Sequence, residues 1–319
     1  MLLYITKKEG NRMPVDELGM NLDYVSYFSL EEYIEKINLL DSLMYHLEDT
    51  DKEFDKYMSL LSTYDDEDII NYWISSAQQE YRANQDIERT KFNTEILKEK
   101  GVFFDKLSIS HKRIHDLHDF VMLSSDESYI PNKNYRKTHV NISRFTEHGE
   151  DIFWRGANPE DVYKFMNDFI NIYKQNKIST IYSNPFLRAA LTSLLFNRIH
   201  PYTDGNGRTS RIIYNLKFTE QMNKIYQTKL MLNPLNISNR ILVNKITYVD
   251  RINHIAFNLT EDTNVAINRW FDFILTMVDE QLYYSKERLT HLIEDSQKSE
   301  TSRQEILKRA KQMKMSKLK

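Results

Sequence analysis

The stretch HPYTDGNGRTSR, from His200 to Arg211, joins two apolar segments of the chain and carries most of its unusual chemistry. Within twelve positions it places a histidine, an aspartate, a Gly-Asn-Gly turn and two arginines. So many polar groups and so much backbone freedom are a poor way to build a hydrophobic core. The stretch therefore predicts a loop that leads from a buried helix into the N-terminus of a second helix.

The segments on either side predict these two helices. Asn184 and Pro185 supply an N-cap and a first-turn proline, and residues 186–199 are apolar on most helical faces. After Arg208 the apolar residues recur at helical spacing, at Ile212, Ile213, Leu216 and Phe218. We expect the first of the two helices to be central and buried.

The rest of the chain indicates a mainly α fold. Its 319 residues include only 7 Gly and 6 Pro, and this scarcity of breakers favours long helices over a many-turned β architecture. Ser29 and Glu32 form a capping box, and apolar residues follow at helical spacing as far as Leu47. Further helices are predicted from Asp65 up to a stop at Gly101, from the Asn158 cap with Pro159, and past Asn264, where Trp270 belongs to a helix that closes the bundle.

A change of pattern between Pro131 and Gly156 predicts a β-hairpin. Apolar and polar residues alternate with a period of two along residues 138–143, which is typical of a strand. Gly149 separates this run from a second one, so we expect a hairpin with a rather long connection.

The overall composition excludes several classes of function. Zero cysteines exclude disulfides, thiolate zinc sites and a cysteine nucleophile, and they fit a reducing cytoplasm. The formal net charge of -3 gives no reason to expect a nucleic-acid or membrane partner. No apolar run approaches the ~20 residues of a membrane-spanning helix, and residues 1–14 lack the apolar core of a signal peptide. We expect a cytoplasmic protein.

The chemistry of the loop points to a phosphate site. The Gly-Asn-Gly turn lets backbone N–H groups converge on an anion at a helix N-terminus. Arg208 and Arg211 lie three positions apart, so their guanidinium groups can face the same side and bind phosphate oxygens. Asp204 can hold Mg2+, and His200 has the side chain best suited to abstract a proton near neutral pH. A tight turn, a solvated arginine pair and a capping histidine would explain each part alone, but their spacing at one junction favours phosphoryl or nucleotidyl transfer.

The twelve residues resemble the motif of the Fic family, H-x-F-x-[D/E]-G-N-G-R-x-x-R, and match it at every defined position but one. Tyr202 stands where the family prefers Phe, so its hydroxyl needs a partner in the core. The similarity extends from Tyr135 to Phe218 and includes the family's flap hairpin and the helix before the motif. The resemblance implies a Fic-type helical bundle with a small β-hairpin flap beside the active site.

The resemblance also implies a protein adenylyltransferase, which moves AMP from Mg-ATP to a hydroxyl side chain of a target protein and releases pyrophosphate. The acceptor would be a Tyr, Ser or Thr of another protein or of the enzyme itself. By position, His200 would activate this hydroxyl and Asp204 would hold Mg2+. The nucleotide would be bound by Gly205, Asn206 and Gly207 at the α-phosphate, by Arg208 along the phosphate chain and by Arg211 at the γ-phosphate. The target backbone would pair with the flap at Thr138, His139, Val140, Asn141 and Ile142.

Other members of the family leave alternatives open. Doc-type toxins phosphorylate their targets, but they have a lysine for the first arginine and lack the second glycine, whereas Gly207 and Arg208 are both present here. Transfer of UMP, GMP or phosphocholine stays open, because the contacts to the base and the head group lie outside the motif. So do a Fic scaffold that has lost activity and one that serves as a regulatory or nucleic-acid-binding module.

A regulatory helix is a further expectation from the resemblance. Many members carry the pattern [S/T]-x-x-x-E-[G/N], whose Glu pairs with the second motif arginine and blocks the γ-phosphate position. A literal match to the first five positions of this pattern places the inhibitory carboxylate at Glu80. A second candidate, Glu88, has Asn84 where Ser or Thr is usual and Arg89 where Gly or Asn is usual. We prefer Glu88, because Ile87 beside it supplies the family's packing residue.

The chain divides by its patterns into three parts. We expect an N-terminal helical region at 1–115 with the candidate inhibitory helix, the Fic core at 116–290 and a basic tail at 291–319. From Gln297 onward the tail holds eight Lys or Arg against two Glu, which predicts either a helix with one basic face or a segment without regular structure. The apolar N-terminal helices can serve a core or a homodimer.

Overall fold

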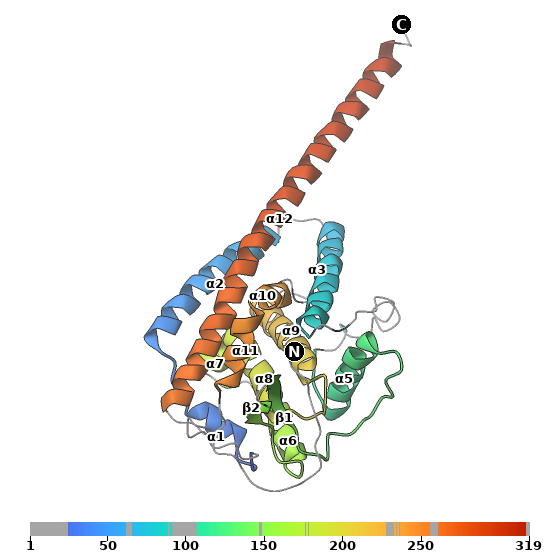
Figure 1. Cartoon of the computed structure of the whole chain (residues 1–319). Helices are drawn as coiled ribbons and strands as arrows, with labels where there is room; N and C mark the ends of the chain where they lie inside the picture. The colour runs from blue at the N-terminus through green and yellow to red at the C-terminus, as the bar shows by residue number, and fades with distance from the viewer. Residues whose placement is uncertain are drawn as a thin grey trace.

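The fold is a bundle of helices with one small hairpin, as Figure 1 shows for the computed structural model. The structure describes residues 25–61, 66–88, 90, 107–146, 149–175, 177, 179–227, 233, 235, 237–255 and 261–316. The helices are α1 (Leu30–Glu35), α2 (Asp41–Leu61), α3 (Asp66–Ile87), α5 (His111–Ser125), α6 (Val162–Lys174), α7 (Thr180–Ser183), α8 (Pro185–Ile199), α9 (Asn206–Ile225), α10 (Ile237–Val243), α11 (Lys245–Asn253) and α12 (Glu261–Ser316). Strands β1 (Asn141–Thr146) and β2 (Gly149–Arg155) pair antiparallel. The predicted mainly α fold with a hairpin is confirmed.

Helix α8 forms the centre of the bundle. All of its residues are buried, and it packs against α6, α7, α9 and α12. Its predicted N-cap is confirmed, because Asn184 Oδ1 accepts the backbone N–H groups of Phe186 and Leu187 at 3.0 and 3.1 Å. A helix buried on every face fixes the loop at its C-terminus with respect to the whole core.

The N-terminal helices differ from the sequence pattern in one respect. Ser29 caps α1 as predicted, but the apolar pattern continues across a break that separates α1 from α2. Asn264 and Asn268 of α12 accept the backbone N–H groups of Asn38 and Leu40 at 3.0 and 2.9 Å. Side chains far along the sequence therefore replace helical hydrogen bonds at this point.

Two predicted starts are shifted. Helix α6 begins at Val162 rather than at Asn158, because the Asn158 carbonyl accepts the N–H groups of Asp161 and Val162 and so closes a turn first. Strand β1 begins at Asn141, and β2 already begins at Gly149, so the connection is short rather than long. Of the flap residues expected on the strand, three precede it, namely Thr138, His139 and Val140.

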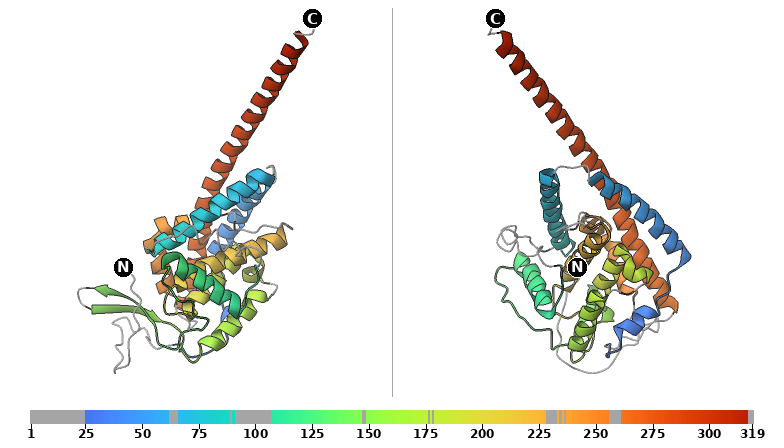
Figure 2. Two further views of the ribbon diagram at one scale, coloured as in Figure 1. Left: turned by 90° about the vertical axis from the view of Figure 1, so that its right-hand side faces the viewer. Right: turned by 180° about the vertical axis from the view of Figure 1, so that it is seen from behind.

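Helix α12 is continuous through the boundary expected at residue 291. Its first part packs against α2, α8, α10 and α11, and its C-terminal part projects away from the body of the molecule (Figures 1 and 2). The expected helix stop at Gly101 and the residue Arg89 lie outside the described residues. Among the helices that the structure describes, none combines the length and the apolar character that crossing a membrane requires.

Candidate active site

The predicted loop is present and its backbone is held by its own side chains. Helix α8 ends in His200, which has left-handed backbone angles (φ 54°, ψ 61°), and α9 begins after Gly205, whose φ is 76°. Asn206 closes the loop between them. Its Oδ1 accepts the N–H of Tyr202 at 2.9 Å and its Nδ2 donates to the Tyr202 carbonyl at 2.8 Å. The side-chain amide of Asn206 thus shapes the loop, which leaves its backbone N–H as the group that can face a phosphate.

His200 is buried and has a defined tautomer. Its Nδ1 lies 3.1 Å from the carbonyl oxygen of Asn197. Because a carbonyl only accepts, Nδ1 carries the hydrogen and Nε2 holds the lone pair of the neutral ring. Burial, together with the positive charges of Arg136 and Arg198, lowers the pKa of His200 to about 3. Trp154 of β2 packs edge-on against the imidazole at 5.4 Å between ring centroids, so the hairpin covers the base.

Two histidines of α5 support the loop from the other side. The Tyr202 hydroxyl bonds with His115 Nδ1 at 2.7 Å, which supplies the partner that the sequence demanded. The Tyr202 ring stacks on His118 with 3.6 Å between centroids, and His118 Nε2 donates to the Asp204 carbonyl at 2.9 Å. Burial lowers the pKa of His118 to about 4, so this donor is a neutral ring.

Asp204 is the acid that a metal ion could use. Its side chain is 46% exposed, and its Oδ1 accepts the N–H of Gly205 at 2.5 Å and lies 3.4 Å from Arg208 Nη2. Within the described part of the chain, no three His, Cys, Asp or Glu residues come together as a metal cage. One accessible carboxylate fits Mg2+, which is usually held by one or two carboxylates, substrate phosphates and water.

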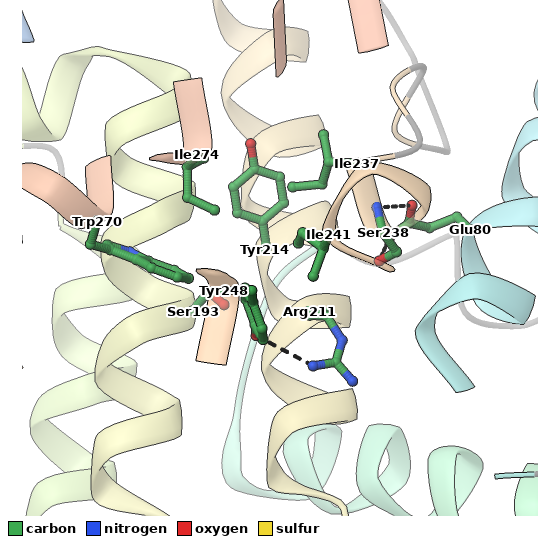
Figure 3. A pocket seen from close by; sticks show the side chains of 10 residues that line it. All are labelled: Glu80, Ser193, Arg211, Tyr214, Ile237, Ser238, Ile241, Tyr248, Trp270 and Ile274. Carbon is green, nitrogen blue, oxygen red and sulfur yellow. Dashed lines mark hydrogen bonds between the residues drawn. The ribbon is translucent and has the colours of Figure 1, made fainter. Parts of the chain in front are cut away.

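The two motif arginines are buried under α3. Arg211 donates from Nε to Asn84 Oδ1 at 2.6 Å, and from Nη2 to the Asn84 carbonyl at 3.2 Å and to Glu88 Oε1 at 3.0 Å. From the other side Arg211 Nη1 donates to the Tyr248 hydroxyl at 3.3 Å (Figure 3). Arg208 donates to Gln85 Oε1 of the same helix at 3.2 Å. Helix α3 therefore occupies donors of both arginines.

The carboxylate of Glu88 also lies against the Gly-Asn-Gly turn. A Cβ atom added to Gly207 would lie 3.0 Å from Glu88 Oε1 and 3.4 Å from Arg211 Nη1. The absence of a side chain at Gly207 thus lets an anion approach the N-terminus of α9 closely. In the described state that anion is Glu88.

Glu80, the less favoured candidate, has other partners. It accepts from the backbone N–H and the hydroxyl of Ser238 on α10 and from Asn215 Nδ2 on α9. Burial raises the pKa of Glu80. A cavity of about 10 Å³ separates its region from Arg211 and Trp270 (Figure 3). Of the two carboxylates, Glu88 makes the expected ion pair and Glu80 attaches α3 to the core.

The flap residues lie beside this loop. Val140 and Ile142 are buried and Thr138 is exposed, while His139 and Asn141 are half-buried. The hairpin that follows projects from the helical body, as the left view of Figure 2 shows. The structure therefore brings the flap, the base and the arginines together at one end of α8.

Several residues of the site were not singled out from the sequence. The unusual Asn84 gave a signal, because it departs from the family pattern at a position next to the arginines. The spacing of His115 and His118 on one helix gave a weaker signal. Ser125, whose hydroxyl accepts from Arg208 at 2.8 Å, and Tyr248 gave none, since their roles depend on tertiary contacts alone.

Comparisons with known proteins agree with this geometry. The model of the Fic/DOC family matches residues 108–217. Protein adenylyltransferase fic-1 of Caenorhabditis elegans is 32% identical over 112 residues, which are 35% of this chain and 19% of that protein. The match thus spans about a fifth of the length of this curated relative. A Fic family protein from Desulfovibrio desulfuricans G20 superposes with a TM-score of 0.56 at 13% identity and covers 79% of this chain and 76% of that one. A fragment of Fic-1 from Caenorhabditis elegans gives 0.51 at 16% identity, with 80% and 73% covered, and both likenesses show a shared fold.

Proposed function

Because residues 108–217 are a domain of the Fic/DOC family, we propose that the chain is a protein adenylyltransferase. It would move AMP from Mg-ATP to the hydroxyl group of a Tyr, Ser or Thr in a target protein, or in the chain itself. One observation carries the proposal. The imidazole of His200 is held neutral, with its hydrogen on Nδ1, next to a glycine-bounded helix N-terminus that has two arginines on its first turns.

The geometry suggests a role for each group. His200 Nε2 takes the proton of the incoming hydroxyl while the oxygen forms a bond to the α-phosphorus. The bond from the α-phosphorus to the bridging oxygen breaks, and pyrophosphate leaves with its electron pair. The first backbone N–H groups of α9 stabilise charge on the α-phosphate, and Arg208 and Arg211 bind the outer phosphates. Asp204 would hold Mg2+, which when bound would neutralise charge on the phosphates.

The contacts of α3 support a regulatory proposal at the same site. Arg211 would be needed for the γ-phosphate, but Glu88 and Asn84 occupy its Nη2 and Nε atoms. A carboxylate and a phosphate compete for the same paired donors. We propose that the described state is a restrained one, and that nucleotide binds productively when Glu88 leaves Arg211.

Labelled nucleotides test the activity. The chain is incubated with Mg-ATP labelled on the α- or the γ-phosphate, alone and with a cell lysate, and products are identified by intact mass and peptide mapping. We expect the α-label to be retained on protein. His200→Asn is the matched variant, because Asn tolerates left-handed backbone angles and keeps the loop while it removes the base. Its rate should fall about 10²- to 10⁴-fold.

Other outcomes would decide against the proposal. Retention of the γ-label would indicate phosphoryl transfer instead. Labelling from UTP or GTP in place of ATP would change the transferred group. Labelling that His200→Asn leaves unchanged would remove the imidazole from the mechanism.

A further inference from the structure

Arg136 connects the hairpin to the motif loop although it lies 64 residues before His200. Its side chain is buried. The Nε donates to the His200 carbonyl at 2.6 Å, Nη1 donates to the Thr138 carbonyl at 2.7 Å, and Nη2 donates to the Ala157 carbonyl at 2.5 Å. Its backbone N–H donates to the Pro201 carbonyl at 2.9 Å.

These carbonyls belong to two parts of the site. Those of His200 and Pro201 lie at the start of the motif loop, directly after α8. Those of Thr138 and Ala157 flank the hairpin on its two sides. A guanidinium is planar, always charged and carries only donors, so it fixes the acceptors around it in one arrangement.

The contact matters because His200 adopts a backbone conformation that side chains other than Gly rarely take. Such a conformation persists only where the surroundings hold it in place. The Arg136 guanidinium binds the carbonyl of this residue directly. Gly156 makes room for it, since a Cβ there would lie 2.8 Å from Arg136 Nη2 and 3.2 Å from His200 Cβ.

We propose that Arg136 is a positioning residue that holds the backbone of His200 and the base of the flap hairpin in one register. The inference rests on the proposed function, in which the base and the bound target must meet at the same phosphorus. A guanidinium shared by both parts delivers them together, so a shift of one is a shift of the other.

The charge of Arg136 acts on the same imidazole. Burial has the largest effect on the pKa of His200, and the cations Arg136 and Arg198 lower it further. A test can therefore separate the geometry from the charge. Arg136→Lys keeps the charge but not the planar set of donors, and Arg136→Met removes both.

The chain offers a matched control in Arg188. This buried guanidinium also binds only backbone carbonyls in the described contacts, those of Tyr182, Ile172, Tyr173 and Gln175. It lies in the first turns of α8, whereas His200 follows the last turn. Arg188→Lys and Arg188→Met therefore report the cost of losing such a guanidinium without touching the base.

The experiment compares the four variants in the full chain. Three quantities are measured: the self-labelling rate at saturating ATP and its KM for ATP, the pKa of the His200 imidazole by NMR, and the melting temperature. We expect Arg136→Lys to lower the rate about 100-fold with KM within about twofold and the His200 pKa unchanged. Arg136→Met should also raise the His200 pKa, because a neighbouring cation disfavours the imidazolium. The Arg188 variants should lower the melting temperature by similar amounts and keep the rate and the His200 pKa.

Equal rates in the Arg136 and Arg188 variants of similar melting temperature would overturn the inference. If the wild-type chain transfers no nucleotide, the proposed function fails on its own, and two other readouts still decide about Arg136. The amide N–H groups of Gly156 and Ala157, which donate to the carbonyls of Val140 and Ile199, should exchange faster in Arg136→Met than in Arg188→Met. Equal exchange and an unchanged His200 pKa would show that Arg136 does not position the loop.

Discussion

Helices α8 and α9 pack against each other, yet their N-termini are built in opposite ways. The start of α8 is completed by its own chain. Asn184 accepts two backbone N–H groups, and Pro185 at the first position has no N–H to satisfy. The start of α9 follows Gly205, which has no side chain to accept anything. There the nearest acceptor beside Gly207 is Glu88, which belongs to a different helix.

The difference separates a structural helix start from one kept for a ligand. A cap within the chain stabilises a helix by about 1 kcal/mol and leaves little attraction for an outside anion. A glycine start forgoes that stabilisation and leaves partial positive charge exposed at the helix end. The chain compensates around α9 with contacts from α5 and α3, which hold the loop and the arginines. Each of the following predictions tests one side of this comparison.

The largest effect is expected at Gly205, where the α9 start depends on glycine. Its φ is 76°, and a Cβ there would lie 2.8 Å from Met122 Sδ and 3.1 Å from His118 Nε2. Gly205→Ala should lower the free energy of unfolding by about 3 kcal/mol or more, because strain and overpacking add. Urea unfolding followed by circular dichroism measures it. A loss below about 1 kcal/mol would contradict the described packing of this loop.

The second prediction concerns acid sensitivity, which should be concentrated near the α9 start. The folded-state pKa of His118 is about 4, below its ordinary value of about 6.5. As the pH falls between these values, the unfolded chain binds a proton that the folded chain does not, so stability is lost on acidification. For a full shift the loss is on the order of 3 kcal/mol.

His118→Gln removes this titration and can still donate to the Asp204 carbonyl. The variant should therefore lose less stability than the wild type between pH 7 and pH 4.5, as measured by urea midpoints. His200, with its pKa lowered to about 3, contributes in the same direction and remains in both proteins. Parallel pH profiles of the two proteins would show that His118 is not buried as a neutral ring.

The third prediction concerns the anion that Glu88 places at the α9 start. Glu88→Gly removes one charge-assisted bond to Arg211, and such bonds contribute about 1.5–3 kcal/mol, so ATP affinity and self-labelling should rise roughly 10- to 100-fold. Asn84 still holds Arg211 through two further contacts. Adding Asn84→Ala should therefore raise both quantities beyond the Glu88→Gly value.

A matched control for Glu88 lies on the same helix. Asp86 is an exposed acid near the end of α3, and Asp86→Asn removes a charge without touching the arginines. Titration calorimetry with ATP and the α-label assay should show no change for this variant. An affinity in Glu88→Gly equal to that of the wild type would remove Glu88 as a restraint.

The same contrast explains what the sequence could predict. Local signals predicted the helix starts at Ser29 and Asn184 and the loop from His200 to Arg211, because caps, glycines and apolar periodicity act within a few residues. The break between α1 and α2 was not predictable, since Asn264 and Asn268 impose it from more than 200 residues away. The partners of Arg211 were only half predictable. Glu88 and Asn84 lie in a recognisable pattern, whereas Tyr248 meets Arg211 only in the fold.

The smallest effect is expected at the capped start of α8. Asn184→Ala removes the acceptor of two N–H groups and should cost about 1 kcal/mol of unfolding free energy. Asn184→Ser keeps a capping hydroxyl and should recover most of this loss. The site lies at the other end of α8, about 20 Å away for a helix of this length, so self-labelling by both variants should match the wild type. A fall in labelling with Asn184→Ala at temperatures where the variant is fully folded would mean that α8 transmits strain to His200, and the division between a structural and a functional helix start would not hold.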